Sequence, residues 1–281
     1  MFNIRRTLTL LSGEFQSAVS WKNALALLLG LSYTCIVTVK YLGYSAATGS
    51  PACAFEPMII IGNMSSYNIF LFSGVLVLIS DAPFLDSASK YRILRSGKKA
   101  YIASNILYII IACFLYYIIC AAASIFVIMK NAYVADVWSL PMQSLSTSDA
   151  NLINDTYGIY FPFREITTLG TPLNCFLHTI VLNSLYCSFL SLVIYSVNLY
   201  AKKIWGAVTA LGIHLIGIVL SDSMFGNPSL SLIIHSSFVQ HHFYGNIDNY
   251  PMLSTSYTIF FLGIIAIIIT CRLLGKRHLE P

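Results

Sequence analysis

Residues 101–129 read YIASNILYIIIACFLYYIICAAASIFVIM, a stretch without a single charged side chain. Crossing the hydrocarbon of a bilayer takes about 20 apolar residues in a helix. The stretch therefore predicts a membrane-spanning helix that is long enough to tilt or to project beyond the membrane. Five other runs resemble it, so we expect an all-α, polytopic membrane protein with six spans, at about 22–42, 58–80, 101–129, 173–200, 204–220 and 255–274.

Composition supports one transmembrane domain over residues 1–281. The chain is 57% hydrophobic and only 10% charged, whereas soluble domains are about 25% charged. The net charge of +5 could indicate nucleic-acid binding, but the basic residues form short clusters beside the apolar runs, where they orient helices. We therefore expect membrane lipid and no nucleic acid as a partner. We also expect no cleaved signal peptide, because the first apolar run starts late for one.

The distribution of Lys and Arg predicts the orientation. Cytoplasmic loops carry an excess of these residues. With the N-terminus inside, 13 of the 16 Lys and Arg residues fall on inner segments, and only Lys40, Lys130 and Arg164 fall outside. Both termini are therefore expected in the cytoplasm, with external loops at 130–172 and 221–254.

Two segments outside the spans carry apolar patterns of their own. Ile4, Leu8, Leu11, Phe15 and Val19 share one helical face, which predicts an amphipathic helix over 4–20 in the inner membrane interface. Residues 229–239 read SLSLIIHSSFV. They are largely apolar but too few to span, which favours a re-entrant or interfacial segment.

The inner loop 81–99 reads DAPFLDSASKYRILRSGKK. Asp81 can cap a short helix that Pro83 begins. The apolar residues Phe84, Leu85 and Tyr91 stand among charges that include Arg92 and Arg95, which suits docking to a cytoplasmic partner. Anchoring on anionic lipid is the alternative. A phosphate-binding loop would need a glycine at 92 and Ser or Thr at 99, so the chain has no recognisable nucleotide site or cofactor of its own.

Several polar side chains fall inside the predicted spans. They serve either as interhelical hydrogen-bonding groups, which we favour, or as the lining of a substrate path. These candidates are Asn63, Asn68, His178, Asn183 and His214. No charged side chain lies near the centre of a span, which argues against an ion-driven pump.

The external histidines His235, His241 and His242 superficially suggest a di-iron oxidase. Such a site needs more histidines and carboxylates, so we expect solvated or gate-lining histidines, no metal and no catalytic residue.

This layout resembles the permease subunit of a type-2 ABC exporter, of the small bacterial kind. The resemblance rests on residues 4–20, 81–99 and 226–252, and on the stretches from Asp81-Ala-Pro-Phe to Tyr91 and Arg95-Ser-Gly-Lys-Lys. Such permeases have six helices with an amphipathic helix before the first, a coupling helix after the second and re-entrant helices before the sixth.

The resemblance implies a permease in a bacterial plasma membrane that is not itself an enzyme. It would pair with a second permease chain, identical or different, and with cytoplasmic ABC ATPase subunits that bind ATP and Mg. The residues that couple to the ATPase would be Asp81, Pro83, Phe84, Leu85, Tyr91, Arg92 and Arg95. The sequence does not indicate which substrate is exported. A polytopic enzyme that uses the external histidines, and an ATP-independent channel or scaffold, are the alternatives.

Overall fold

The computed structural model describes residues 4–17, 20–82, 89–163, 166–201, 203–221, 227–241 and 250–278. Within this part of the chain, five helices are long and apolar enough to cross a membrane, and a bent pair makes a sixth candidate. The protein therefore has the all-α architecture of a polytopic membrane protein. The five helices are α2 (Trp21–Ala47), α6 (Lys98–Ile128), α10 (Pro172–Tyr200), α11 (Lys203–Ser221) and α13 (Leu253–His278).

The second predicted span, 58–80, is a bent pair of helices and not one continuous helix. Helix α3 (Glu56–Asn63) and helix α4 (Ser65–Ile79) meet at an angle of 87°. All eight residues of α3 are buried. Helix α4 has 15 residues, or about 22 Å at 1.5 Å per residue, which is short of the ~30 Å hydrocarbon layer. The pair is thus a broken span or a re-entrant unit.

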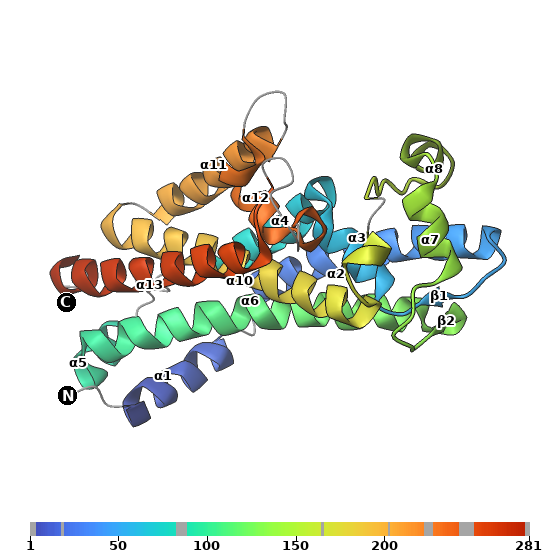
Figure 1. The fold of residues 1–281 in the computed structure, drawn as a ribbon. Coiled ribbons are helices and arrows are strands. Elements are labelled where there is room, and N and C mark those ends of the chain that lie inside the picture. Colours follow the sequence, from blue (N-terminus) through green and yellow to red (C-terminus); the bar gives the residue numbers. More distant parts are fainter. Residues whose placement is uncertain are drawn as a thin grey trace.

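Helix α10 forms the centre of the bundle (Figure 1). It packs against α6, α11, α13 and α3. Its span is 72% buried, against 22% for α11 and 17% for α13. Helices α11 and α13 therefore turn most of their apolar surface outward, as helices that face lipid do.

Two glycines let α6 pack against α2 and α4. A Cβ atom added at Gly30 on α2 or at Gly74 on α4 would lie 2.1 Å from the hydroxyl of Tyr116 on α6. The Tyr116 side chain is 1% exposed. Its phenol ring therefore lies in a slot that exists only because both positions lack a side chain.

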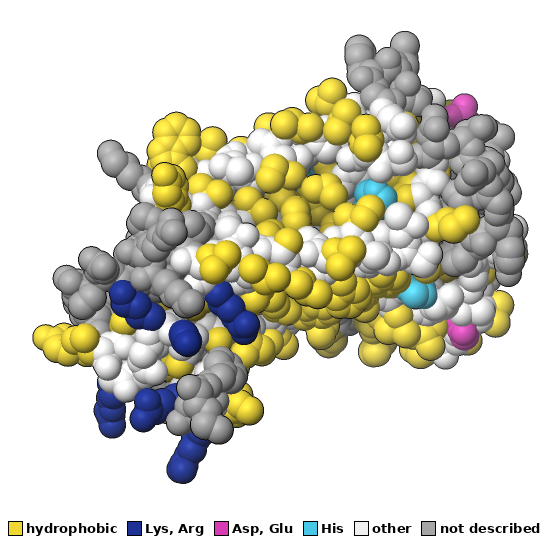
Figure 2. Space-filling model, turned by 60° about the vertical axis from the view of Figure 1, so that its left-hand side comes forward, with side chains coloured by type: hydrophobic (Ala, Val, Ile, Leu, Met, Phe, Trp, Pro, Cys, Tyr) yellow, Lys and Arg dark blue, Asp and Glu magenta, His cyan; other side chains and the backbone are white. Residues whose placement is uncertain are grey.

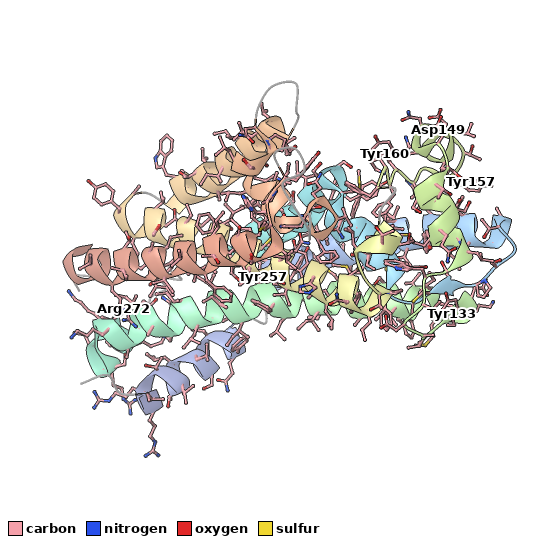
Figure 3. The ribbon with its side chains drawn as sticks, in the orientation of Figure 1. Tyr133, Asp149, Tyr157, Tyr160, Tyr257 and Arg272 are labelled. Carbon is pink, nitrogen blue, oxygen red and sulfur yellow. The ribbon has the colours of Figure 1, made fainter. Side chains whose placement is uncertain are left out.

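The two ends of the bundle differ in character. Helices α1 (Ile4–Ser17) and α5 (Ser89–Ser96) and the end of α13 lie at one end (Figure 1). Lys and Arg side chains gather there (Figure 2), and Arg272 is labelled at this end in Figure 3. We call it the basic end, after exposed cations that include Arg5, Arg6, Arg95, Lys99 and Arg272.

The opposite end carries a small folded cap. Most of it lies within residues 130–172, for which the sequence predicted only a loop. After the short helix η1 (Met129–Asn131), strand β2 (Ala132–Tyr133) pairs in parallel with β1 (Ala52–Cys53). Three short helices follow: α7 (Leu140–Thr147), α8 (Ala150–Tyr157) and α9 (Ile166–Leu169). We call β1, β2, α7, α8 and α9 together the cap.

The apolar stretch before the last helix forms three short turns of helix. They are η2 (Pro228–Leu230), α12 (Leu232–Ser236) and η3 (Phe238–Gln240). They pack on α10, α11 and α13, and Ile233, Ile234 and Phe238 are buried. We call residues 228–241 the clasp segment. It is a compact insert with a buried core, and its re-entrant or interfacial position stays a prediction.

Helix α1 packs along α6. Its buried face differs from the apolar face that the sequence predicts for residues 4–20. Leu11 and Phe15 contact the core, but Ile4 and Leu8 are 65% and 55% exposed. The side chain of Glu14, which falls outside the apolar stripe, is 4% exposed because it is paired with a cation. The helix thus rests on the bundle with one edge of its apolar face and leaves the other edge uncovered.

Candidate functional site

Helix α5 presents an exposed apolar surface at the basic end. Gly97, with a φ of 87°, separates it from α6. Ile93 is 9% exposed and packs against the core, whereas Tyr91 and Leu94 are 77% and 66% exposed. Arg95 is also exposed. The helix therefore offers an aromatic ring, a branched apolar side chain and a cation on its outer side.

Ion pairs tie this region to the first two helices. Arg92 Nη1 lies 3.0 Å from Glu14 Oε1 on α1, and Lys22 Nζ lies 2.5 Å from Asp81 Oδ2. Arg92 therefore faces α1, and Asp81, expected to cap a helix, pairs with the first residues of α2. Pro83, Phe84 and Leu85 lie outside the described residues.

Three of the predicted intramembrane amides come together at the α3–α4 break. Asn63 donates to Thr179 Oγ1 at 2.9 Å and to Ile59 O at 2.7 Å. Its Oδ1 accepts the Val239 amide at 3.2 Å. Asn183 donates to Gly62 O at 3.0 Å. These bonds satisfy backbone and side-chain groups that a break in a membrane helix leaves without partners.

The network continues into α4 and α6. Asn68 donates to Asn183 Oδ1 at 2.6 Å and accepts from Tyr117 at 3.2 Å. The Tyr117 hydroxyl also contacts Cys187 Sγ at 3.2 Å. Asn63, Asn68 and Asn183 are all at most 2% exposed. In this conformation they hold α3, α4, α6 and α10 together, and a role in lining a substrate path stays a prediction.

The two predicted intramembrane histidines are apart from these amides. His178 Nδ1 lies 2.7 Å from the hydroxyl of Tyr257 on α13, and its ring stacks on Phe238. His214 Nδ1 lies 2.8 Å from the hydroxyl of Tyr186, and its ring stacks on Phe72. Each histidine therefore joins neighbouring helices.

Two of the histidines expected outside are buried, so they are not solvated, and the gate-lining alternative stays a prediction. His235 and His241 are 3% and 4% exposed, and both contact Ser256 on α13. His242 lies outside the described residues. Across the described ranges, no three His, Cys, Asp or Glu side chains are grouped so that they could hold a metal ion.

A buried carboxylate that sequence reasoning missed joins the cap to the bundle. Glu56, at the start of α3, is fully buried. It accepts hydrogen bonds from Tyr41, from the Cys53 amide and from both the amide and the hydroxyl of Ser139. Four donors match an ionised carboxylate, which can only accept. The acidic residue before Pro57 was a helix-start signal that could have located it.

Burial also changes the thiol beside this carboxylate. It raises the pKa of Cys53 to about 11, so at neutral pH the thiol carries its proton and reacts poorly. All seven cysteines are free, and Cys53 donates to Ala135 O at 3.3 Å. In the cap it acts as a small buried side chain.

No family model, curated protein or solved structure matches the chain. We therefore infer function from the geometry of the two ends and of the buried polar clusters.

Proposed function

We propose that this chain is the permease subunit of a type-2 ABC exporter, with six spans and both termini in the cytoplasm. The order of elements supports the proposal. Helix α1 precedes the first long helix, α5 lies between α4 and α6, and the clasp segment precedes α13. The broken α3–α4 pair counts as the second span.

Helix α5 is the observation that carries the proposal. A helix of eight residues that exposes Tyr91 and Leu94 in a basic surface leaves apolar area uncovered. Each such side chain stabilises a complex by roughly 1.5–3 kcal/mol when it is fully buried. Aromatic anchors tend to dominate protein interfaces, while Arg95 sets orientation and encounter rate. The partner is a cytoplasmic ABC ATPase, which would bind ATP and Mg.

The ion pairs provide a route for force from α5 into the bundle. Arg92 holds α5 to Glu14 of α1, and Asp81, just after α4, holds Lys22 at the start of α2. An ATPase that moves α5 would therefore pull on α1 through the Arg92–Glu14 pair. A second permease chain would supply the other half of a translocation path for the exported substrate.

The test is co-purification of an ABC ATPase with the tagged chain isolated from its native membranes. The double variant Tyr91→Ala, Leu94→Ala should insert normally but recover at least tenfold less ATPase and lose substrate-stimulated hydrolysis in liposomes. Leu152→Ala is the matched control, because Leu152 on α8 is as exposed as Leu94, at 66%, but lies in the cap at the opposite end.

Equal recovery of a fully active complex from the wild type and the double variant would return α5 to a lipid-anchoring role. A chain that transports its substrate with no ATPase present would instead be an ATP-independent channel. A metal-dependent reaction lost in His235→Ala, His241→Ala protein would revive the enzyme alternative.

A further inference from the structure

A partly open cavity of about 350 Å³ lies in the cap. We call it the cap cavity. The end of α7, the start of α8 and the segment after α8 form its wall, through Ser146, Ser148, Asp149, Asn151, Tyr160 and Pro162. Cavities that bind small molecules have volumes of about 300–1,000 Å³, so the cap cavity has room for a small ligand.

Buried apolar side chains hold the walls of the cap cavity in place. In the segment after α8, Ile159 and Phe161 are fully buried, whereas Tyr160 and Pro162 line the cavity. This alternation is that of an extended chain, in which successive side chains point to opposite faces. Leu145 is also fully buried and anchors the end of α7. The shape of the cavity therefore follows from the packing of the cap.

The charge around the cap cavity is negative. Residues 132–163 contain three aspartates and no Lys or Arg. Arg164 and Glu165, which follow, have opposite charges and lie outside the described residues. Asp149 Oδ1 accepts the Asn151 amide at 2.9 Å, and within the described ranges no cation forms an ion pair with Asp149. Its side chain is exposed, so a ligand in the cavity can reach the carboxylate.

Two positive groups near the cap cavity are weaker than this carboxylate. The N-terminus of α8 carries about half an elementary charge, but the N-cap residue Asp149 brings a full negative charge to the same place. Lys40 donates to Gly158 O at 3.3 Å, at the other end of α8 and about 13 Å from Asp149 at 1.5 Å per residue. Charges are screened over about 8 Å at physiological ionic strength. The cavity therefore favours a cation over an anion.

Tyr160 adds a group that selects the kind of cation. The residue is half-buried and lines the cavity together with Asp149 (both labelled in Figure 3). Its backbone N–H donates to the hydroxyl of Tyr67 on α4 at 2.8 Å, which fixes it to the bundle. Aromatic rings attract cations, and organic ammonium groups are typical ligands of aromatic side chains. A carboxylate and a tyrosine in one cavity thus suit an ammonium group.

We propose that the cap cavity binds a small organic ammonium ion. Asp149 neutralises the charge of the ligand, and Tyr160 contacts its ammonium group. Ser148 and Asn151 offer hydrogen bonds to polar substituents. The cap lies opposite the basic end (Figure 1), so the cation approaches the part of the molecule that is far from the clustered Lys and Arg side chains. The site does not depend on the proposed ATPase partner.

The test is saturation-transfer NMR of the full chain in a maltoside detergent, which has no ammonium group, with choline as the probe. The alcohol 3,3-dimethyl-1-butanol has the same shape as choline and no charge. Choline should bind at millimolar concentration, and about fivefold more tightly than the alcohol, as expected for one partly exposed charge pair. Absence of choline binding, or equal affinities for choline and the alcohol, would overturn the proposal.

Substitutions locate the site. Asp149→Asn removes the charge and keeps the helix cap, because Asn and Asp are equally good at this position. It should weaken choline binding about fivefold and leave the helix content and the binding of the alcohol unchanged. Tyr160→Leu should weaken choline binding by about two- to fivefold.

Asp155→Asn is the matched control. Asp155 is exposed on the same helix as the start of the cavity and is not among the described residues that line it, so choline binding should not change. Unchanged choline binding in Asp149→Asn, or equal losses in Asp149→Asn and Asp155→Asn, would show that the cavity is not the site.

Discussion

The slot around Tyr116 depends on two single residues, Gly30 and Gly74. Replacing either with Ala places a methyl group 2.1 Å from the tyrosine hydroxyl. Overpacking of this kind typically destabilises a protein by about 1–3 kcal/mol. We expect Gly30→Ala to lower the Tm in detergent, with partial recovery in the double variant Gly30→Ala, Tyr116→Leu.

Gly43→Ala is the control for this prediction. It lies on the same helix as Gly30, and an added Cβ there would meet nothing within 4 Å. It should leave stability unchanged or raise it by about 0.5–1 kcal/mol, because Ala favours helix over Gly. An equal loss of stability in Gly30→Ala and Gly43→Ala would contradict the role of the slot.

Sequence reasoning singled out unusual residues but could not find their partners. The sequence alone shows a polar side chain within an apolar run, which is why Asn63, Asn183 and His214 are candidates. Their bonds join positions that are distant in sequence, such as Asn63 and Thr179, 116 residues apart. Glu56 was missed because its role exists only where α2, β1 and the start of α7 meet α3.

At the scale of elements, the α3–α4 break depends on Asn183. Its amide donates to Gly62 O and Thr179 O, and its Oδ1 accepts from Asn68. We expect Asn183→Ala to destabilise the protein by about 1–3 kcal/mol, the cost of leaving buried polar groups without partners. Unfolding in detergent would measure the loss.

Asn154→Ala is the matched substitution for Asn183→Ala. The Asn154 side chain is exposed on α8, so its removal should change stability by less than about 0.5 kcal/mol. If both variants unfold at the same temperature, the amide network does not hold the break.

Hydropathy located the helices but not their shapes. The limits of α6 and α10 follow from long uncharged runs. The bend after Asn63 does not, since 58–80 contains neither a charged residue nor a proline and the residue at the break is Met64. The bend forms because distant residues satisfy the exposed backbone groups, a cause that no local pattern records.

At the scale of the whole molecule, the two ends predict an orientation. The basic end carries α1, α5 and the end of α13, and the cap lies opposite (Figure 1). By the positive-inside rule, a reporter fused after Lys99 should behave as cytoplasmic and one at Asp149 as external. An external signal at Lys99 would overturn the six-span topology.

The long-range bonds at the α3–α4 break also fix the order of events during biosynthesis. Asn63 receives its last partner from Val239, 176 residues further along the chain. At about 5–20 residues per second, a ribosome needs roughly 9–35 s to add them. For that interval the kink lacks its bond to the clasp segment, although Asn183, 121 residues after Gly62, is made earlier. Completion of the kink therefore follows synthesis of the clasp segment, and a chain that ends before Val239 cannot complete it.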